Sequence, residues 1–566
     1  MCESIIITDI TPRLNADYGL STPIRSVGAY RISTSLHNAG YTSRVIDFFF
    51  YMDYVLQKEI LKKIITKETL FIGFSNTNLR GHTKKANQQP LIHNFETGVT
   101  EQRTDSIFYF WENARQVINW IRNTYPHVKI VLGGGQLSAT KKNAFSVIDN
   151  YFDYIITGDA DESVIRLASY LKFKTQIKTY TTWKVNGNQA NFKKCKIIHS
   201  EKDYPLANIH FDNLDIKHEK IKSHLLSNEW LFVEMSRGCI FNCFFCSYKH
   251  VNNKRPIESI KKEILQNYYN FGITKFRLID DTFNDDYQKV KDFTSMLQKL
   301  PFEAEWHTYA RADLFRKRFD MIDMMYESGC KYLKFGLEST NDNVLKAINK
   351  SVSHKDIADI LEKIYMKTNG DLYMHSNFIL GLPLETKQSI FDMFSYIKNS
   401  PLTTVSFTTF FRDKFYEDES DYRTMSEFGK KEYSTMYNID GYYGSWKHST
   451  LDSSTALEMY DKAFDIFTKT APYWVGSDLY PILRTYGISH KDTLNYLKKC
   501  VGLYLDDNVN NWYSEQLIEV LSKYIDLLKK DLGIRIKNSY TIPDLIFKTE
   551  LVNIKEHYKK IEVEHL

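Results

Sequence analysis

The chain has 566 residues, which is too long for a single hydrophobic core and predicts several domains. Hydrophobic residues make up 43% and charged residues 25%, which is ordinary for a globular protein and excludes a fibrous or wholly disordered chain. The net charge is only +5 and no long basic run is present, so nucleic-acid binding gains no support from charge.

The chain also predicts an intracellular protein without a membrane partner. No window approaches 18 uninterrupted apolar residues, and the first residues, "MCESIIITDITPRL", lack the pattern of a secretory signal. Seven cysteines, three of them clustered, suit a reducing compartment better than a disulfide framework. We therefore expect a cytoplasmic location.

Residues 1–172 alternate short β-rich runs with amphipathic stretches. The predicted strands are 4–8, 43–49, 70–75, 129–135 and 153–159, and the predicted helices are 25–39, 53–66, 107–124, 140–149 and 161–172. Five such units in series predict an α/β domain with a doubly wound parallel sheet, whose ligand lies beyond the carboxyl ends of the strands.

Small and polar residues stand at those strand ends: Ser75, Thr77, Gly133, Gly134, Gly135 and Gly158. A missing Cβ lets the backbone approach a bulky or phosphorylated ligand, although the same residues are also ordinary turn formers. The polar, aperiodic stretch 80–106 is too long for a simple connection and is either a lid or a disordered insertion. Residues 173–225 read as a hairpin with an Asn-Gly turn, followed by a connector.

A second series begins near residue 225. Its predicted strands are 230–236, 275–280, 305–310, 331–338, 372–380 and 404–410, and its predicted helices are 256–271, 286–299, 314–328, 341–349, 354–367 and 386–398. Six repeats predict a partial (β/α)6 barrel whose chemistry lies in the loops after the strands. The predicted domains are thus 1–200, 225–430 and a helical C-terminal region, 431–566, of unknown role.

Cys239, Cys243 and Cys246 lie within eight residues, directly after the first strand of the second series. Such a cluster indicates a metal centre. Either the three thiolates hold a [4Fe-4S] cluster and leave one iron without a protein ligand, or His250 completes a structural Cys3His zinc site. The neighbouring Ile240, Phe241, Phe244 and Phe245 are expected to surround the cysteines with apolar groups, which favours the iron-sulfur alternative.

Cys-x3-Cys-x2-Cys with an aromatic residue before the third cysteine resembles the radical S-adenosylmethionine (SAM) superfamily. Four later segments are similar to its strand-end motifs in order and spacing: "FRLIDDTFNDD" (276–286), "YARADLF" (309–315), "FGLESTNDNVLKAINK" (335–350) and "FILGLPLET" (378–386). The stretch 20–49, with "IVLGGG" and "DYIITGDADESV", resembles the cobalamin-binding domain that precedes the radical domain in one subgroup. The resemblance covers roughly residues 4–410.

This resemblance implies an enzyme whose open iron chelates SAM. One electron from the reduced cluster would cleave SAM to methionine and a 5′-deoxyadenosyl radical, which abstracts a hydrogen atom from a small-molecule or unidentified substrate. It also implies a reducing partner such as flavodoxin or ferredoxin. Cobalamin-dependent methylation is one possible outcome, and another radical modification is the alternative.

The resemblance also implies roles for individual residues. Phe245 would lie near the adenine, and Gly381 and Pro383 would shape the backbone edge against it. The remaining implied SAM contacts are Asp280, Asp281 and Thr282 for the amino group, Arg311 for the carboxylate or the substrate, and Glu338 and Ser339 for the ribose or methionine portion. The small strand-end residues of the first domain would lie against cobalamin. Each of these residues could also be an ordinary buried polar group or a turn residue.

The chain departs from the family pattern in its first domain. Many cobalamin-binding domains carry Asp-x-His-x-x-Gly after the first strand, but the stretch 8–23 contains no histidine, and His37 is interpreted as a surface residue of a helix. Cobalamin would then bind without a lower ligand from the protein, or the domain has kept its fold and lost the cofactor.

Two other functions can be weighed against the radical SAM interpretation. A methylthiotransferase would need a second cluster, for which Cys2 and Cys195 are too few, while Cys330 and Cys500 read as small buried residues. A non-catalytic metalloprotein, with a structural zinc or a sensing iron-sulfur site, is the alternative from another class.

Overall fold

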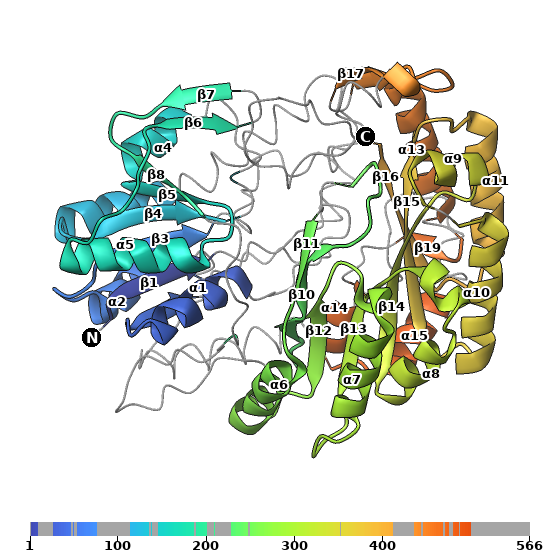
Figure 1. Cartoon of the computed structure of the whole chain (residues 1–566), viewed down its shortest axis with the longest axis horizontal. Coiled ribbons are helices and arrows are strands. Elements are labelled where there is room, and N and C mark those ends of the chain that lie inside the picture. The colour runs from blue at the N-terminus through green and yellow to red at the C-terminus, as the bar shows by residue number, and fades with distance from the viewer. Residues whose placement is uncertain are drawn as a thin grey trace. The chain divides into compact units, whose positions relative to one another are not determined.

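The computed structural model describes residues 2–8, 27–46, 49, 54–75, 114–134, 137, 145–185, 188–200, 209, 228–246, 250–350, 352–410, 435–442, 445–467, 470–474, 479–485 and 487–499. These residues fall into two compact units, one up to residue 209 and one from residue 228 onward (Figure 1). The division lies near the boundary that we predicted between the first two domains. The ranges 1–200, 225–430 and 431–566 themselves stay predictions.

The first unit is built on a six-stranded parallel sheet with the order β2-β1-β3-β4-β5-β8. Its strands are β1 (Ser4–Thr8), β2 (Ser43–Ile46), β3 (Phe71–Ser75), β4 (Lys129–Gly133), β5 (Tyr154–Thr157) and β8 (Lys196–His199). Its helices are α1 (Val27–Asn38), α2 (Tyr54–Ile64), residues 114–124, α4 (Phe145–Tyr151) and α5 (Asp161–Phe173). The strand order 2-1-3-4-5 confirms the doubly wound, flavodoxin-like fold.

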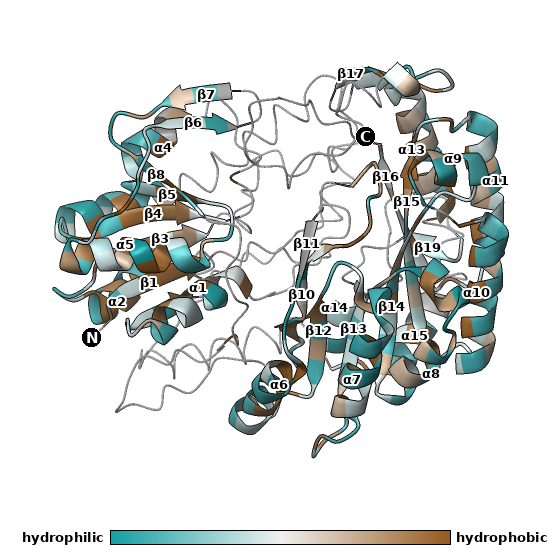
Figure 2. Ribbon diagram, in the orientation of Figure 1, coloured by the Kyte–Doolittle hydropathy of each residue, from teal (hydrophilic) through white to brown (hydrophobic). Residues whose placement is uncertain are grey.

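Buried aliphatic side chains explain why these short runs form strands. Ile5, Ile72 and Ile130 lie on neighbouring strands and are all fully buried, as central parallel strands require when helices cover both faces. The apolar character of β4 is visible in Figure 2. The strand β8 was not predicted, because "KIIH" is only four residues long and stands between a hairpin and a connector. That hairpin is present as β6 (Thr182–Val185) and β7 (Asn188–Asn191).

The second unit is built on a seven-stranded parallel sheet with the order β19-β16-β15-β14-β13-β12-β9. Its strands are β9 (Leu231–Glu234), β12 (Lys275–Ile279), β13 (Glu305–Ala310), β14 (Cys330–Glu338), β15 (Tyr373–Leu380), β16 (Thr404–Thr409) and β19 (Tyr473–Trp474). The crossover helices are α6 (Ile257–Phe271), α7 (Tyr287–Leu297), α8 (Asp320–Glu327), α9 (Asp342–Ala347), α10 (His354–Thr368) and α11 (Lys387–Lys398). The six predicted strands and the partial barrel are confirmed.

Three details of the second unit differ from our predictions. The helix predicted at 314–328 is broken into the 3-10 turn η6 (Ala312–Arg316) and α8. The cysteine segment is flanked by an antiparallel hairpin, β10 (Ser236–Cys239) and β11 (His250–Lys254), which we did not predict. A short η5 turn (Phe283–Asp285) follows β12.

The C-terminal region is less purely helical than predicted. It contains α13 (Ser453–Phe467), α14 (Leu479–Thr485) and α15 (His490–Lys499), together with the hairpin β17 (Asp440–Tyr442) and β18 (Ser445–Lys447). Its strand β19 pairs with β16 and so extends the barrel sheet. Residues 500–566, including Cys500, lie outside the described residues.

The two faces of the second sheet have opposite character. Side chains on one face are apolar and buried, as shown by Phe276, Trp306 and Phe407. This face carries aromatic contacts to helices, including Phe293–Trp306 and Phe394–Phe407 at centroid distances of 5.4 and 5.7 Å. Figure 1 shows α7, α8, α10 and α11 along the outer side of the strands. Alternation of side chains therefore directs the other set of strand residues away from these helices.

The other face is polar and opens toward the carboxyl ends of the strands. On β15, His375 is fully buried while Asn377, two residues later, is half-buried; on β16, Thr404 is fully buried, Ser406 is half-buried and Thr408 is exposed. Register pairs His375 with Thr404 and Asn377 with Ser406, so these residues share the face. A ligand can therefore reach polar groups on this face from the carboxyl ends.

Tyr480 of α14 lies against the early residues of the same face. Its ring centroid is 5.2 Å from that of Tyr332 and 4.9 Å from that of Tyr373, and all three rings are fully or almost fully buried. Arg484 of the same helix forms an ion pair with Glu305 at the start of β13. The C-terminal region thus covers the amino-terminal part of the polar face.

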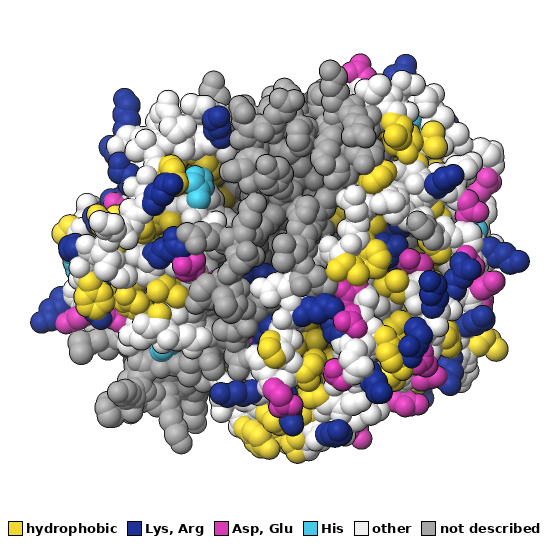
Figure 3. All heavy atoms as spheres, viewed as in Figure 1, with side chains coloured by type: hydrophobic (Ala, Val, Ile, Leu, Met, Phe, Trp, Pro, Cys, Tyr) yellow, Lys and Arg dark blue, Asp and Glu magenta, His cyan; other side chains and the backbone are white. Residues whose placement is uncertain are grey.

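On the face drawn in Figure 3, basic and acidic side chains of the described residues are interspersed rather than gathered by sign. Among the helices of the described part of the chain, none is long and apolar enough to cross a membrane.

Candidate active site

The cysteine loop begins at the end of β10, where the backbone of Cys239 pairs with that of His250 in β11. Cys243 is buried, and its carbonyl accepts a hydrogen bond of 3.0 Å from the Cys246 N–H. The loop is also held from outside: the Phe244 N–H donates to the Ile348 carbonyl at 3.1 Å, and the Asn349 amide donates to the Asn242 carbonyl at 2.7 Å. The predicted ligands therefore lie on one anchored loop.

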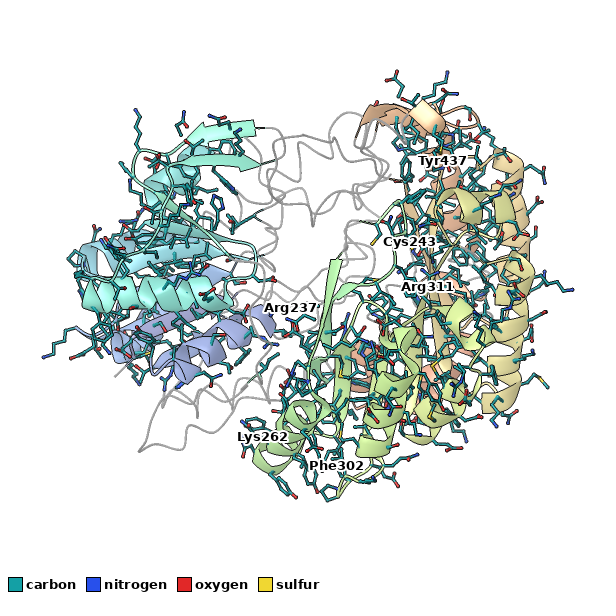
Figure 4. All side chains as sticks on the ribbon, in the orientation of Figure 1. Arg237, Cys243, Lys262, Phe302, Arg311 and Tyr437 are labelled. Atoms are coloured by element: carbon teal, nitrogen blue, oxygen red, sulfur yellow. The ribbon has the colours of Figure 1, made fainter. Side chains whose placement is uncertain are left out.

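Two polar side chains from neighbouring strand ends contact the sulfur atoms. The Thr282 hydroxyl, after β12, is 3.5 Å from the Cys239 sulfur, and the Arg311 guanidinium, after β13, donates to the Cys243 sulfur at 3.4 Å. Figure 4 shows Cys243 and Arg311 at this end of the sheet. Burial raises the pKa of the Cys239 thiol, and the Thr282 hydroxyl partly opposes this rise.

Arg311 is fixed in place by several contacts. Its guanidinium forms two hydrogen bonds with the Asp313 carboxylate, at 3.0 and 2.9 Å, and lies 4.1 Å from the centre of the Phe241 ring. Its backbone N–H donates to Asn284 at 2.9 Å. Burial lowers the pKa of Arg311, but Asp313 and Cys243 outweigh burial and the pKa is raised. Arg311 therefore stays cationic beside the cysteine loop.

The expected apolar surround is only partly present. Phe241, Phe244 and Phe245 are half-buried, whereas Ile240 is 58% exposed and does not shield the cysteines. The prediction was wrong for Ile240 because the loop after β10 leaves its side chain facing solvent. The described His, Cys, Asp and Glu side chains contain no group of three or more arranged to hold a metal ion, the three cysteines included.

The segment after β12 separates the two predicted aspartates. Asp280 is buried and already accepts hydrogen bonds from the Thr282 N–H and from Lys289, each at 3.0 Å. Asp281 is exposed, and its pKa is raised by desolvation among the surrounding loops and then by the Asp280 charge, while the Gly238 N–H opposes the rise. Asp281 is thus the more available of the two to a ligand.

Glu338 ends β14 in an unusual backbone conformation. Its φ is +68°, and the register with β15 shifts between Gly336 and Glu338, as in a β-bulge. The Glu338 carboxylate is almost fully buried and forms an ion pair with Lys350 at 3.3 Å. Ser339 is also buried. A bulge at a strand end re-aims side chains, and here it places both residues at the carboxyl edge of the sheet.

The motif after β15 is packed against the C-terminal region. Gly381 has a φ of +91°, and a Cβ there would lie 2.4 Å from the Trp446 ring. Pro383 is buried in the same turn. His448 contacts the Gly381 carbonyl at 3.1 Å, and its ring stacks on that of Trp446 at 5.2 Å. Residues of the C-terminal region, whose role the sequence left unknown, therefore hold this turn in place.

Sequence reasoning missed Glu385, the fully buried carboxyl group beneath this turn. It accepts the Gly381 N–H at 2.6 Å and interacts with Ser339, so it links the ends of β15 and β14. Burial raises the pKa of Glu385 to about 8, although the Gly381 and Leu382 N–H groups and Ser339 lower it in part. Glu385 could have been found from the sequence, because it belongs to the motif "FILGLPLET" whose Gly381 and Pro383 we had singled out.

In the first unit, the described strand-end residues lie at the predicted edge. Ser75 and Gly133 are paired in register at the ends of β3 and β4, Gly134 follows, and Gly158 follows β5. Their small size leaves the backbone accessible at that edge. Thr77 and Gly135 lie outside the described residues, as do most of the stretch 8–23 and all of 80–106. His37 is half-buried in α1.

Comparison with known proteins identifies the second unit. Residues 233–397 match the family model of the radical SAM superfamily, which confirms the resemblance inferred from the cysteine motif. An uncharacterized methyltransferase, PH0819, of Pyrococcus horikoshii is 24% identical over 304 residues, which are 52% of this chain and 63% of that protein. The chain therefore spans less than two thirds of this relative.

Two solved structures share the fold over the whole chain. TsrM from Kitasatospora setae, a radical SAM methyltransferase with tryptophan and a SAM analogue bound, aligns over 100% of both chains with a TM-score of 0.55 and 12% identity. OxsB, a cobalamin-dependent SAM radical enzyme with aqua-cobalamin and SAM bound, aligns over 100% of this chain and 84% of its own, with a TM-score of 0.57 and 14% identity. The two-domain fold is thus shared with both.

Proposed function

We propose that this chain, which carries a radical SAM domain at residues 233–397, is an enzyme that binds a [4Fe-4S] cluster through Cys239, Cys243 and Cys246 and cleaves SAM reductively. The observation that carries the proposal is the cysteine loop at the carboxyl end of the barrel sheet, with Arg311 and Thr282 on its sulfur atoms. Chemistry in such barrels belongs to this end of the strands.

The chemistry of the donor set fits an iron-sulfur cluster, although the sulfur atoms of these three described cysteines are not gathered as a metal-binding group in this structure. Three thiols on one short loop match the thiolate ligands that such clusters use, and hydrogen bonds to sulfur tune their potential. The Arg311 guanidinium donates to the Cys243 sulfur, and the Thr282 hydroxyl lies 3.5 Å from the Cys239 sulfur. When bound and reduced, the cluster supplies one electron that cleaves SAM to methionine and a 5′-deoxyadenosyl radical.

The described residues at the strand ends suit the groups of SAM. The exposed Asp281 carboxylate can accept hydrogen bonds from the ammonium group. Glu338 and Ser339, at the end of β14, are proposed for the ribose or methionine portion. The turn of Gly381 and Pro383 is proposed to pack against the adenine by shape, because the Gly381 N–H and carbonyl are already engaged by Glu385 and His448. Asp280 contributes by accepting the Thr282 N–H, and its carboxylate is also engaged in an ion pair with Lys289.

The polar face of the barrel sheet suits an organic substrate that carries hydrogen-bond acceptors. His375 contacts Thr404 at 2.9 Å and the Asn377 oxygen at 3.0 Å, and Ser406 donates to that same oxygen at 2.5 Å. With its oxygen engaged in this way, Asn377 is left with its NH2 group to offer a ligand. The half-buried Asn377 is therefore a candidate substrate contact.

For the first unit we propose cobalamin binding at the carboxyl edge of the sheet. The described Ser75, Gly133, Gly134 and Gly158 fit a bulky cofactor because their small side chains leave room for it. Bound cobalamin would supply a methyl carrier, and methylation of the substrate would follow. The fold shared with TsrM and OxsB supports this proposal.

The decisive experiment is product analysis after reconstitution. The protein is purified anaerobically, reconstituted with iron and sulfide, and incubated with SAM and dithionite in place of the physiological reductant, for which we propose a flavodoxin or ferredoxin. We expect 5′-deoxyadenosine and methionine. A cluster-loaded sample that forms no 5′-deoxyadenosine contradicts the proposed function, and about one zinc without iron per chain supports the alternative of a structural metalloprotein.

A further inference from the structure

The turn that follows α9 contacts two separate parts of the proposed site. The Ile348 carbonyl accepts the Phe244 N–H, and the Asn349 side chain donates to the Asn242 carbonyl, so both hold the cysteine loop. Lys350 donates to the Gly336 carbonyl and to the Glu338 carboxylate. Three consecutive residues therefore join the cysteine loop to the end of β14.

The backbone of this turn is well defined. Asn349 has a φ of +60°, its N–H donates to the Lys346 carbonyl at 3.1 Å, and the Lys350 N–H donates to the Leu345 carbonyl at 2.8 Å. These two bonds and the left-handed residue form a Schellman motif, which satisfies the last carbonyls of α9. The motif sets the directions in which Asn349 and Lys350 leave the helix.

Lys350 and Gly336 together surround the Glu338 carboxylate. A Cβ on Gly336 would come within 2.3 Å of the Glu338 carboxylate oxygen, so the carboxylate folds back over a residue without a side chain. Lys350 is 6% exposed and Glu338 is 7% exposed, which makes the ion pair a buried one. Removing one partner of a buried ion pair leaves an uncompensated buried charge, which is strongly destabilising.

We propose that Ile348–Lys350 is a positioning turn that keeps the cysteine loop and Glu338 in register. Asn349 positions the loop through the Asn242 carbonyl, and Lys350 positions Glu338. The inference rests on the proposed function, because it assigns Glu338 to SAM and the loop to the cluster. None of the three residues of the turn is a catalytic residue.

The Asn349 arm can be tested without any cofactor. In the Asn349→Gly variant the left-handed backbone is retained, because glycine adopts it freely, and only the amide side chain is lost. We expect hydrogen exchange of the Phe244 amide in the metal-free protein to rise roughly fivefold, as for the loss of one net hydrogen bond. The matched control is Asn369→Gly, which changes another left-handed asparagine, at the exposed end of α10. Unchanged exchange in the loop overturns this arm.

The Lys350 arm is tested by SAM binding to the reconstituted protein, measured by equilibrium dialysis. Lys350→Met should weaken SAM binding by about tenfold or more while iron content stays unchanged, and Lys350→Arg should restore part of the affinity. The control is Lys346→Met, which changes an exposed lysine of α9. Equal affinity in wild-type and Lys350→Met proteins overturns this arm.

A double-mutant cycle separates positioning from general damage. In a Glu338→Gln background no carboxylate remains to be positioned, so Lys350→Met should have little further effect on SAM affinity. Additive losses would show that Lys350 acts by another route and contradict the inference. If the reconstituted wild-type protein binds no SAM, both the proposed function and the role of Lys350 are contradicted. The role of Asn349 is tested separately, because hydrogen exchange is measured without SAM or a cluster.

Discussion

His250 lies close in sequence to the three cysteines, but this closeness does not show whether it is a fourth metal ligand. The backbone of His250 pairs with that of Cys239 across the β10–β11 hairpin. Proximity in sequence alone could not tell a fourth ligand from a hairpin residue. If one iron of the cluster has no protein ligand, as we propose, His250 should contribute nothing to metal retention.

We therefore expect His250→Ala to keep the iron content and visible absorbance of the reconstituted protein, and Cys243→Ala to lose most of both. The physical reason is that each iron held by the protein needs its thiolate, while the fourth iron needs none from the chain. Iron analysis and absorption spectra measure this. Loss of metal in His250→Ala would point to the Cys3His zinc site instead.

Glu385 makes stability depend on pH in a predictable direction. Its pKa is raised by burial to about 8 in the folded protein, against an ordinary value near 4.5. The unfolded chain therefore releases this proton at lower pH than the folded chain, and the neutral group stabilises the fold fully only below about pH 4.5. The contribution declines as pH rises and is lost by about pH 8.

The Glu385→Gln variant should lack this part of the pH dependence. We expect the free energy of unfolding of the variant to fall less than that of the wild type between pH 5 and pH 8, by a few kcal/mol at most. Chemical denaturation at several pH values measures the difference. Parallel stability curves for the two proteins would show that the carboxyl group is not held neutral.

Packing between elements, rather than the motif alone, shapes the turn after β15. Gly381 lies against Trp446, His448 contacts its carbonyl, and Thr450 donates to the Glu385 carbonyl at 2.6 Å. The segment after β17 thus supports a turn that precedes it by more than sixty residues. A motif predicts where such a turn lies but not what holds it.

The Gly381→Ala substitution should destabilise the second unit by about 1 kcal/mol or more, because a left-handed residue gains a Cβ and that Cβ meets an indole ring. Thermal unfolding measures the loss, and weaker SAM binding should accompany it. Gly28→Ala is the control, since a Cβ at Gly28 meets nothing within 4 Å. Equal stability of wild-type and Gly381→Ala proteins would show that Trp446 moves aside freely.

The described residues include two large parallel sheets that lie in different compact units, which allows the proposed cofactors to be tested separately. Each unit has its own parallel sheet and its own buried apolar residues. Contacts of the proposed cobalamin site and of the proposed cluster site thus come from different units.

We expect the Cys243→Ala protein, which lacks the cluster, still to bind cobalamin. The described residues at the carboxyl edge of the first sheet belong to one compact unit, and Cys243 belongs to the other. The visible spectrum of cobalamin that remains with the protein after gel filtration measures binding. Retention by neither wild type nor variant would indicate a first unit that has kept the fold without the cofactor.

The succession of strands and helices along the chain, the two α/β units and the cysteine loop could be predicted from the sequence. These features depend on local patterns, because the periods of strands and helices and the spacing of cysteines are each written within a few residues. The strand β8 and the β10–β11 hairpin were not predicted, because strands of four or five residues are too short to show a clear hydrophobic periodicity. The exposed Ile240 escaped it because spacing does not tell which side of a turn a residue faces.

The contacts between polar groups that are distant in sequence could not be predicted and follow from the packing of the folded chain. Asn349 and Asn242 are 107 residues apart, yet one hydrogen bond joins them. The buried Glu385 lies beneath Gly381 and beside Ser339, and Lys350 holds Glu338, through contacts that no local pattern contains. Such pairs form because packing of separate strands leaves buried polar groups that must find partners, and the partner is chosen by geometry in space.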